Sequence, residues 1–318
     1  MQKKLLIIHQ GALGDIVSIF TAIIRLKEKL RQIDIICKKS IGELTSFLKL
    51  TDKYHPAESA LFSSLFSYEA DHRIVDILRP YDEIILFSFS EELEITIARL
   101  LNKKIYRFNP RPDASSEIHV LNNVMGYLFQ NGLISDTKLT ATDYFPESVR
   151  PANNPCDRLK IFIHPGSGSL RKNWKLHNFI KVFEKIRSLG MNPEIITGPA
   201  EENLAGIMAE SLPAGTKIHN MQNLLDLAKL LSQAGGFIGN DSGISHLAAF
   251  TGIPTVVIFG PSSPKRWAPF GRSVEVLRPA TDCTPCFETE KSNCTETKCL
   301  ELTTPDMVVE TLLRIHRK

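Results

Sequence analysis

Residues able to hold a phosphate gather in IGNDSGISHLAAFTGIPTVVIFG, residues 238–260. Residues 236–240 predict the end of an apolar strand, residues 252–260 predict the next strand, and the pattern between them predicts a helix. The residues at the strand exit and in the first turns of this helix are Asp241, Ser242, Gly243 and His246. Unpaired N–H groups and the positive end of the helix dipole favour an anion there. The alternative is a capped turn whose polar residues only satisfy the backbone.

HPGSGSLRKNW, at residues 164–174, is a second turn that follows an apolar strand. It combines glycines with the hydroxyl of Ser167 and the ammonium of Lys172, a set that can hold a diphosphate. It lacks the Gly-Lys-Ser/Thr ending of a Walker A loop, and the alternative is a solvated turn with surface cations. In a third strand exit, TGPAEEN at residues 197–203, Glu202 either complements a helix dipole or binds a ribose hydroxyl.

A carboxylate stands in the first strand-to-helix turn, QGALGD at residues 10–15. The turn is G-x-x-G rather than G-x-G-x-x-G, a weak match to the dinucleotide fingerprint that disfavours a nicotinamide oxidoreductase. On spacing alone, Asp15 is a helix cap that the helix dipole stabilises as an anion. The sequence contains neither G-x-S-x-G nor H-E-x-x-H, which removes the commonest hydrolase and zinc-protease signals.

The elements that position these turns alternate between apolar strands and amphipathic helices, which predicts parallel sheets covered on both faces. A linker with three prolines and no periodicity, PESVRPANNPCDR at residues 146–158, divides the chain. We therefore expect two Rossmann-like domains, over residues 1–150 and 151–318, that face each other across a cleft. The last helix is a candidate to pack back on the N-terminal domain.

Composition places the chain among soluble globular proteins, with 318 residues, of which 43% are hydrophobic and 23% charged. The net charge of +3 is too small to indicate a nucleic-acid partner. His9, Gln10 and Asp15 interrupt the apolar N-terminal run too early for a signal peptide. No apolar stretch reaches the ~20 residues that span a bilayer. We therefore expect a cytoplasmic protein.

Four of the six cysteines crowd into seventeen residues with the spacing C-x2-C-x7-C-x4-C. These four are Cys283, Cys286, Cys294 and Cys299. Without an export signal, disulfides are not expected, and metal ligation is worth weighing. The second pair lacks the x2 gap of a zinc ribbon, so reduced structural thiols are the favoured interpretation. If the cluster holds zinc or iron, the four thiolates are its ligands, and we expect the cluster to lie away from the cleft.

Taken together, these segments resemble glycosyltransferase family 9, the heptosyltransferases of lipopolysaccharide core assembly. The matching segments, in chain order, are GALGDIV (11–17), HPGSGSLRKNW (164–174), TGPAEE (197–202) and GNDSGISHLAAFTGIPTVVIFGPSSPKRW (239–267). CTPCFETEKSNCTETKC (283–299) also resembles a segment of many members. The order of these motifs is far more specific than any one of them.

The resemblance implies a GT-B fold, an α/β architecture of two Rossmann-like domains whose parallel sheets face a central cleft. It implies an inverting transfer, without a metal at the reaction centre, of heptose from ADP-L-glycero-D-manno-heptose to the lipopolysaccharide inner core. The donor would lie mainly on the C-terminal domain. The acceptor, a Kdo or heptose on a lipid A-linked oligosaccharide, would meet the N-terminal domain at the inner face of the cytoplasmic membrane, through a transient contact with its surface.

The resemblance also assigns roles residue by residue. Asp15 matches the catalytic base, since an inverting transfer needs one carboxylate to take the acceptor proton. Lys172 matches a contact to the donor phosphates and would neutralise charge on the leaving diphosphate. The other residues that match donor contacts are Gly14, Ser167, Glu202, Asp241, Ser242, Gly243 and His246. Among them, Gly14 corresponds to the backbone turn under the diphosphate and Glu202 to a nucleoside-binding carboxylate.

One segment departs from the family pattern. Residues 114–133 stand where members usually have a more basic helix, so the acceptor need not be the standard one. A second interpretation therefore keeps the fold but changes the sugar or the acceptor, for example to an O-antigen or capsule glycan. A third interpretation is a non-catalytic nucleotide-binding module, which the joint presence of Asp15, Lys172 and Asp241 disfavours.

Overall fold

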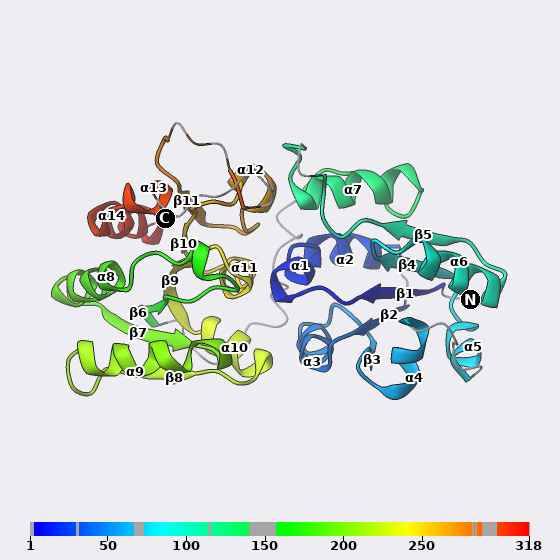
Figure 1. The fold of residues 1–318 in the computed structure, drawn as a ribbon, viewed down its shortest axis with the longest axis horizontal. Coiled ribbons are helices and arrows are strands. Elements are labelled where there is room, and N and C mark those ends of the chain that lie inside the picture. The colour runs from blue at the N-terminus through cyan, green and yellow to red at the C-terminus, as the bar shows by residue number, and fades with distance from the viewer. Residues whose placement is uncertain are drawn as a thin grey trace. The chain divides into compact units, whose positions relative to one another are not determined.

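Two compact α/β units make up the chain in a computed structural model (Figure 1). The first comprises Met1–Asp113 and Val120–Val149, and the second comprises Ala114–His119 and Arg150–Lys318. The structure describes residues 3–29, 32–66, 73–113, 116–139, 157–281, 283, 285–287 and 298–317.

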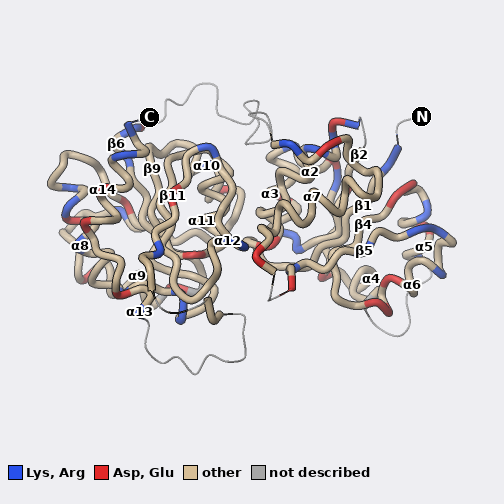
Figure 2. The backbone as a smooth tube through the Cα atoms, turned by 90° about the horizontal axis from the view of Figure 1, so that it is seen from above, with Lys and Arg blue, Asp and Glu red and all other residues tan. Residues whose placement is uncertain are grey.

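The first unit holds a five-stranded sheet in the order β3-β2-β1-β4-β5, and all of its strand pairs are parallel. Its strands are β1 (Lys4–His9), β2 (Gln32–Cys37), β3 (Lys53–Pro56), β4 (Glu83–Phe87) and β5 (Ile105–Phe108). Its helices are α1 (Leu13–Val17), α2 (Phe20–Lys27), α3 (Lys39–Phe47), α4 (Ala60–Ser63), η1 (Ser64–Phe66), α5 (Arg73–Leu78), α6 (Glu91–Leu101) and α7 (Val120–Gln130). Figure 2 shows α2, α3 and α7 on one side of this sheet and α4, α5 and α6 on the other. Residues 5–8 of the central strand are buried for this reason.

The second unit holds a six-stranded sheet in the order β11-β10-β9-β6-β7-β8, also parallel throughout. Its strands are β6 (Asp157–His164), β7 (Asn192–Thr197), β8 (Ile218–Asn220), β9 (Ala234–Asn240), β10 (Thr255–Ile258) and β11 (Val274–Leu277). Its helices are η4 (Leu170–Lys172), α8 (Leu176–Ser188), η5 (Pro199–Glu201), α9 (Glu202–Ser211), α10 (Leu224–Leu231), α11 (Gly243–Phe250), α12 (Pro264–Trp267), α13 (Lys298–Glu301) and α14 (Pro305–His316). Phe179 and Phe183 of α8 pack with Ile161 of β6 in its apolar core.

The last helix, α14, packs on the second sheet. Val308, Leu312 and Ile315 belong to the apolar core of the second unit. Their spacing of four and then three residues places them in one stripe along the helix, and this stripe is buried against the sheet. This stripe places α14 in the second unit, and a further contact of the helix with the N-terminal domain stays a prediction.

Two element limits concern the first turn and the linker. Two helices, α1 and α2, follow β1, and they separate at residues 18–19. The linker predicted over residues 146–158 ends earlier, because β6 begins at Asp157 and the Asp157 N–H donates to the Gln233 carbonyl at 2.9 Å. Residues 146–156 lie outside the described residues.

The strand order reverses once in each sheet. In the first sheet the chain places β2 and β3 on one side of β1, and then crosses to β4 and β5 on the other side. In the second sheet it places β7 and β8 on one side of β6, and then crosses to β9. Ligands of open α/β sheets bind outside the carboxyl ends of the strands at such a reversal. The turns after β1, β6 and β9 occupy these positions.

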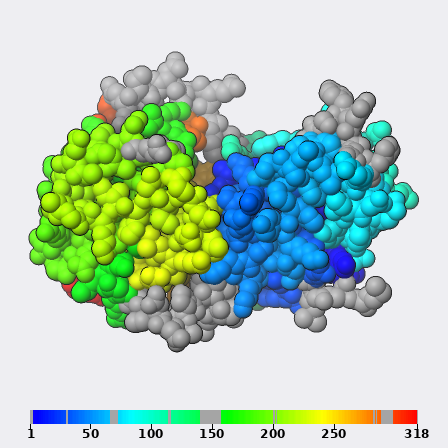
Figure 3. All heavy atoms as spheres, turned by 90° about the horizontal axis from the view of Figure 1, so that it is seen from below, coloured from blue at the N-terminus to red at the C-terminus, as the bar shows by residue number. Residues whose placement is uncertain are grey.

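The surface of the chain carries charges of both signs. Lys and Arg are scattered among Asp and Glu over both units (Figure 2). In the space-filling view each unit presents a closely packed surface (Figure 3). Within the described residues, no helix has the length and hydropathy needed to cross a bilayer.

Candidate functional site

Asn240, the last residue of β9, joins the two turns at the reversal point of the second sheet. Its side chain is fully buried, and its Nδ2 donates to the Pro165 carbonyl at 2.8 Å. Its Oδ1 accepts the main-chain N–H of Trp174 at 3.0 Å. One amide therefore braces both ends of the 165–174 loop against β9. Because β6 and β9 are neighbours in the sheet, this brace places the loop beside the N-terminus of α11.

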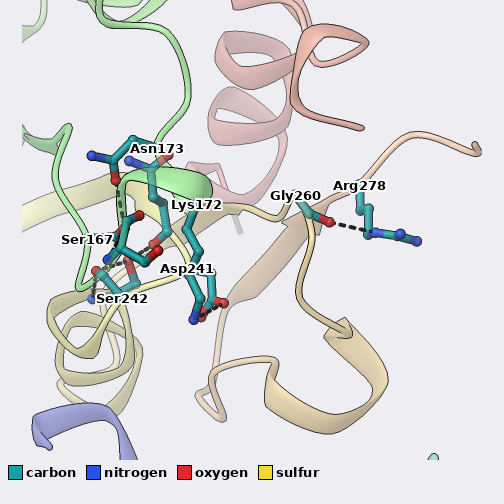
Figure 4. A network of polar contacts seen from close by, with 10 residues as sticks. Ser167, Lys172, Asn173, Asp241, Ser242, Gly260 and Arg278 are labelled. Atoms are coloured by element: carbon teal, nitrogen blue, oxygen red, sulfur yellow. Dashed lines mark hydrogen bonds and ion pairs between the residues drawn. The ribbon is translucent and has the colours of Figure 1, made fainter. Parts of the chain in front are cut away.

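Lys172 and Asp241 form an ion pair across this edge. The Lys172 Nζ lies 2.8 Å from Asp241 Oδ2, and the side chains are 20% and 6% exposed (Figure 4). Asp241 is fixed in turn, because its N–H donates to the Ile258 carbonyl of β10 at 3.1 Å. A mostly buried ammonium next to two strand ends can exchange its carboxylate partner for a phosphate oxygen. Two of the residues that the resemblance assigns to the donor, Lys172 and Asp241, are thus in direct contact.

The N-terminus of α11 follows Asp241 directly in the chain. Ser242 is its N-cap, and the Ser242 Oγ accepts the N–H of Ser245 at 3.3 Å. Gly243 is the first helical residue and is partly exposed, so its N–H group stands at the positive end of the helix dipole. His246 lies one turn further on and is only 6% exposed. The Ser242 cap therefore does not exclude an anion-binding site, because it satisfies only one of the unpaired N–H groups at the N-terminus of α11.

Ser167 acts inside its own loop. The Ser167 Oγ lies 2.7 Å from the Ser169 carbonyl and 2.6 Å from Asn173 Oδ1, and it accepts the N–H of Ser169 at 3.3 Å (Figure 4). A hydroxyl has one proton, so it donates to one of these oxygens at a time. The structure thus shows Ser167 closing the turn, and its contact with a phosphate stays a prediction.

Glu201, rather than Glu202, is the carboxylate that the structure describes at the third turn. Glu201 Oε2 accepts the N–H of Gly198 at 2.7 Å, and a Cβ on Gly166 would come within 2.5 Å of the Glu201 side chain. The nearby His164 donates its Nδ1–H to the Ile196 carbonyl at 3.0 Å. Burial lowers the pKa of His164, and the Glu201 carboxylate acts in the opposite direction. The side chain of Glu202 lies outside the described residues, so its role stays a prediction.

The start of the cysteine-bearing segment lies against the 165–174 loop. The Phe287 ring centroid is 4.4 Å from Lys172 Nζ, and the Cys286 Sγ is 3.7 Å from Arg171 Nη2. The main-chain N–H groups of Cys286 and Phe287 both donate to the Pro261 carbonyl, at 2.8 and 3.0 Å. The expectation that this segment lies away from the site is therefore wrong, because the loop after β10 holds it beside Lys172.

The cysteines themselves do not form a ligand set in the described part of the chain. Cys283 is exposed, Cys286 and Cys299 are half-buried, and Cys294 lies outside the described residues. No cluster of three or more His, Cys, Asp or Glu residues suited to a metal occurs among the described residues. The four-cysteine metal site thus stays an untested alternative.

Asp15 stands at the reversal point of the first sheet, in α1 just beyond β1. Its Oδ2 accepts the N–H of Ala12 at 3.1 Å and lies 3.8 Å from Arg111 Nη2, and its side chain is 16% exposed. The hydrogen bond to Ala12 is the cap that the spacing predicted. Both contacts reach the same oxygen, so Oδ1 accepts no hydrogen bond from the residues that the structure describes. A carboxylate held through one oxygen keeps the other for a proton.

His9 and Gly11 hold this turn. The His9 Nδ1 accepts the N–H of Gly11 at 3.1 Å, and burial lowers the pKa of His9 to about 4 despite the nearby Asp15. A Cβ on Gly11 would lie 2.5 Å from His9 Cε1 and 2.9 Å from the Asp15 Cβ, so only glycine fits between them. Gly14, assigned by resemblance to the turn, lies inside α1, where its carbonyl accepts the N–H of Ser18. Gly11 is thus the close-approach glycine.

A pocket of about 290 Å³ opens beside this carboxylate in the first unit. Its lining residues are Arg107, Phe108, Asn109, Arg111, Pro112, Asp113, Asn123 and Tyr127. Arg107 forms ion pairs with Glu94, where Nε lies 2.8 Å from Oε2, and with Glu91, where Nη2 lies 3.0 Å from Oε1. Arg111 is 60% exposed, so its guanidinium is open to a solvent-side anion.

The structure brings some of the predicted site residues together and adds residues that position them. Lys172, Asp241 and Ser242 meet at one sheet edge as predicted. Asn240 and Phe287 were not predicted. The signal for Asn240 was an amide at the end of an otherwise apolar strand, GGFIGN, where a buried polar group needs partners.

Comparison with known sequences gives a family match. Residues 129–296 match the profile of Glycosyltransferase family 9 (heptosyltransferase), which is more than half of the chain. Lipopolysaccharide heptosyltransferase 1 of Pseudomonas aeruginosa is 30% identical over 136 residues. That alignment spans 42% of this chain and only 37% of the relative.

Comparison with solved structures gives the same fold. The crystal structure of the glycosyl transferase family 9 protein from Veillonella parvula has a TM-score of 0.78 at 16% identity, covering 100% of this chain and 98% of that one. The E. coli heptosyltransferase WaaC with ADP has a TM-score of 0.72 at 16% identity, covering 98% and 99%. The iron-containing dodecameric glycosyltransferase TibC of enterotoxigenic E. coli has a TM-score of 0.61 at 19% identity, covering 99% and 76%. The fold is GT-B, with two parallel sheets.

Proposed function

Because the chain belongs to glycosyltransferase family 9, we propose that it transfers a heptose from an ADP-heptose donor to the inner core of lipopolysaccharide. The observation that carries this proposal is the ion pair of Lys172 with Asp241 beside the N-terminus of α11. A cation, a capped helix terminus and a braced loop at one strand-order reversal form a seat for a diphosphate. The solved WaaC structure, which holds ADP, supports a nucleotide ligand of this kind.

Lys172 would bind the donor diphosphate and stabilise the charge that develops on it as the glycosidic bond breaks. An interaction that strengthens with that charge lowers the barrier and not only the free energy of the bound substrate. Ser242 and Gly243 would donate their N–H groups to phosphate oxygens. Ser167, Glu202 and His246 are proposed to contact the remainder of the donor.

Asp15 would be the general base of an inverting transfer. Its Oδ2 is held by the Ala12 N–H and faces Arg111, which leaves Oδ1 to take the proton from the acceptor hydroxyl. The attacking oxygen then forms a bond to the anomeric carbon while the ADP diphosphate leaves with the bonding electrons.

The acceptor is proposed to be a Kdo or heptose residue of a lipid A-linked oligosaccharide, at the inner face of the cytoplasmic membrane. The Arg111 side of the 290 Å³ pocket is suited to an anionic sugar of this class. A related transferase with another nucleotide-sugar or glycan acceptor is the alternative. It is favoured by the segment 114–133, which carries His119 and the acidic Glu117 but no Lys or Arg.

No step of this mechanism passes through a metal. We propose that the cysteines are structural thiols, with zinc or iron ligation as the alternative. TibC is an iron-containing glycosyltransferase of similar fold, which makes the alternative worth a direct test. Elemental analysis of protein purified without chelator decides it: one equivalent of zinc or iron supports ligation, and none supports plain thiols.

A nucleotide panel tests the proposed function. ADP, UDP, GDP and CMP are compared by thermal shift, where a ligand at 100 times its Kd adds about 2.7 kcal/mol to the unfolding free energy. We expect ADP to stabilise the wild type and to stabilise Lys172→Met measurably less at the same ADP concentration. Lys185→Met is the matched control, since it breaks a 2.7 Å ion pair with Asp306 elsewhere in the second unit. Stabilisation by another nucleotide in place of ADP would favour the alternative donor, and none by any of them would reject the proposal.

A further inference from the structure

We propose that Phe287 is a positioning residue for Lys172, and that the start of the cysteine-bearing segment is a wall of the donor site. The inference rests on the proposed function of Lys172 and adds a residue that none of the matching motifs assigns to the donor. Its basis is the place of the Phe287 ring beside the ammonium group.

Lys172 is held between a carboxylate and an aromatic face. Its Nζ is 2.8 Å from Asp241 Oδ2 and 4.4 Å from the centroid of the Phe287 ring. A lysine side chain has many rotamers, and an ammonium within about 6 Å of a ring centroid is attracted to the ring face. The two contacts together fix the ammonium at the edge of the sheet. When a diphosphate displaces Asp241, the ring remains as the partner that keeps the ammonium in place.

The ring is itself held by the main chain. The N–H groups of Cys286 and Phe287 converge on the Pro261 carbonyl at 2.8 and 3.0 Å. Arg278 fastens the same segment, since its Nε donates to the Gly260 carbonyl at 3.1 Å and its Nη2 to the Cys283 carbonyl at 3.4 Å (Figure 4). These bonds tie the segment to the loop after β10, next to the strand end that carries Asp241. The ring is therefore a fixed part of the site.

Phe287 does not serve the apolar core. It is half-buried and is not among the described residues that pack in the core cluster of the second unit. Its recorded partners are cations, because the Arg171 Cζ also lies 5.6 Å from the ring centroid. A half-buried ring outside the core cluster adds little apolar burial to the stability of the fold. Replacing it should thus alter ligand binding with little change in melting temperature.

A double-mutant cycle separates positioning from a general structural effect. Wild type, Phe287→Leu, Lys172→Met and the double variant are compared for ADP affinity by calorimetry and for melting temperature. We expect Phe287→Leu to weaken ADP binding about five-fold, Phe287→Tyr to restore it, and Phe287→Leu to have no further effect once Lys172 is Met. Equal losses in both backgrounds, or no loss at all, would overturn the inference.

Tyr106→Leu is the matched control, because Lys104 Nζ lies 4.6 Å from the Tyr106 ring centroid in the first unit. Its ADP affinity should equal that of the wild type. A measurement made without nucleotide distinguishes the role of Phe287 from the proposed function. After reductive ¹³C-methylation, the Lys172 methyl resonance should be shifted upfield by the ring current and should return in Phe287→Leu. If the wild type binds no nucleotide, the proposed function fails, and the chemical shift of this resonance alone tests whether Phe287 contacts Lys172. A resonance that is not shifted in the wild type would contradict the contact.

Discussion

Asp15, the proposed general base, and Lys172, the proposed ligand of the donor diphosphate, are held in position in different ways. The hydrogen bond to Asp15 is local, since it comes from Ala12 three residues before it, and the ion pair of Asp15 with the exposed Arg111 is long, at 3.8 Å. Lys172 is held by partners far away in sequence, Asp241 and Phe287, at the edge that Asn240 braces. A group that must accept a proton benefits from one unoccupied oxygen, whereas a group that must meet developing charge benefits from a fixed position. The comparison teaches that the first site depends on one turn and the second on the whole sheet edge.

The largest expected effect is on the local site. Asp15→Asn removes the proton acceptor but keeps an oxygen for the Ala12 N–H. We expect turnover to fall by about two to four orders of magnitude, with ADP affinity and folding near wild type. Steady-state kinetics with donor and acceptor measure the fall. Asp76→Asn, which alters an exposed carboxylate of α5 in the same unit, is the control. Retention of most activity in Asp15→Asn would remove the base assignment.

The next largest effect is on the helix terminus of the second unit. Gly243→Val places a branched side chain where the phosphate is proposed to meet the N–H groups, so we expect no measurable ADP binding. Gly206→Val is the matched control, because Gly206 lies in α9 and a Cβ there meets nothing within 4 Å. Calorimetric titration of both variants with ADP makes the comparison. Normal ADP affinity in Gly243→Val would show that the diphosphate lies elsewhere.

A stability effect should follow from loss of the brace. Asn240→Leu leaves the Trp174 N–H and the Pro165 carbonyl without their buried partner. We expect a loss of about 1–3 kcal/mol in the free energy of unfolding, measured with urea. Asn203→Leu, at an exposed position of α9, should stay within about 0.5 kcal/mol of the wild type. An equal change in both variants would show that the brace contributes nothing.

A gradual effect is expected in the pH dependence of the first site. Burial lowers the pKa of His9 from 6.5 to about 4, so between these values the unfolded chain binds a proton that the folded chain does not. The unfolding free energy should therefore fall as pH drops from 6.5 to 4, by up to about 1.4 kcal/mol per pH unit from this group. His164, whose pKa is also lowered, adds loss of the same sign. His9→Gln should reduce the slope, and an unchanged slope would contradict the burial argument.

Much of the fold could be predicted because strands and helices leave local patterns. The apolar run of β1 and the three-to-four-residue spacing of apolar residues in α8 are visible in the sequence. In the structure these apolar residues are the buried ones. The break between α1 and α2 could not be predicted, since Ser18 and Ile19 suit a helix as well as a turn. Lys172 and Asp241 were found because motif and chemistry agree. The contact of Lys172 with Phe287 could not be predicted, because it joins residues more than one hundred positions apart through the loop after β10.

In the proposed function, the donor binds the second unit, and Asp15 of the first unit accepts the proton. A crystal structure of the protein with ADP tests this most directly. We predict the diphosphate within hydrogen-bond distance of the Ser242 and Gly243 N–H groups and of Lys172 Nζ, with Asp15 free of any nucleotide contact. ADP bound only at the turn of residues 11–15 would contradict it.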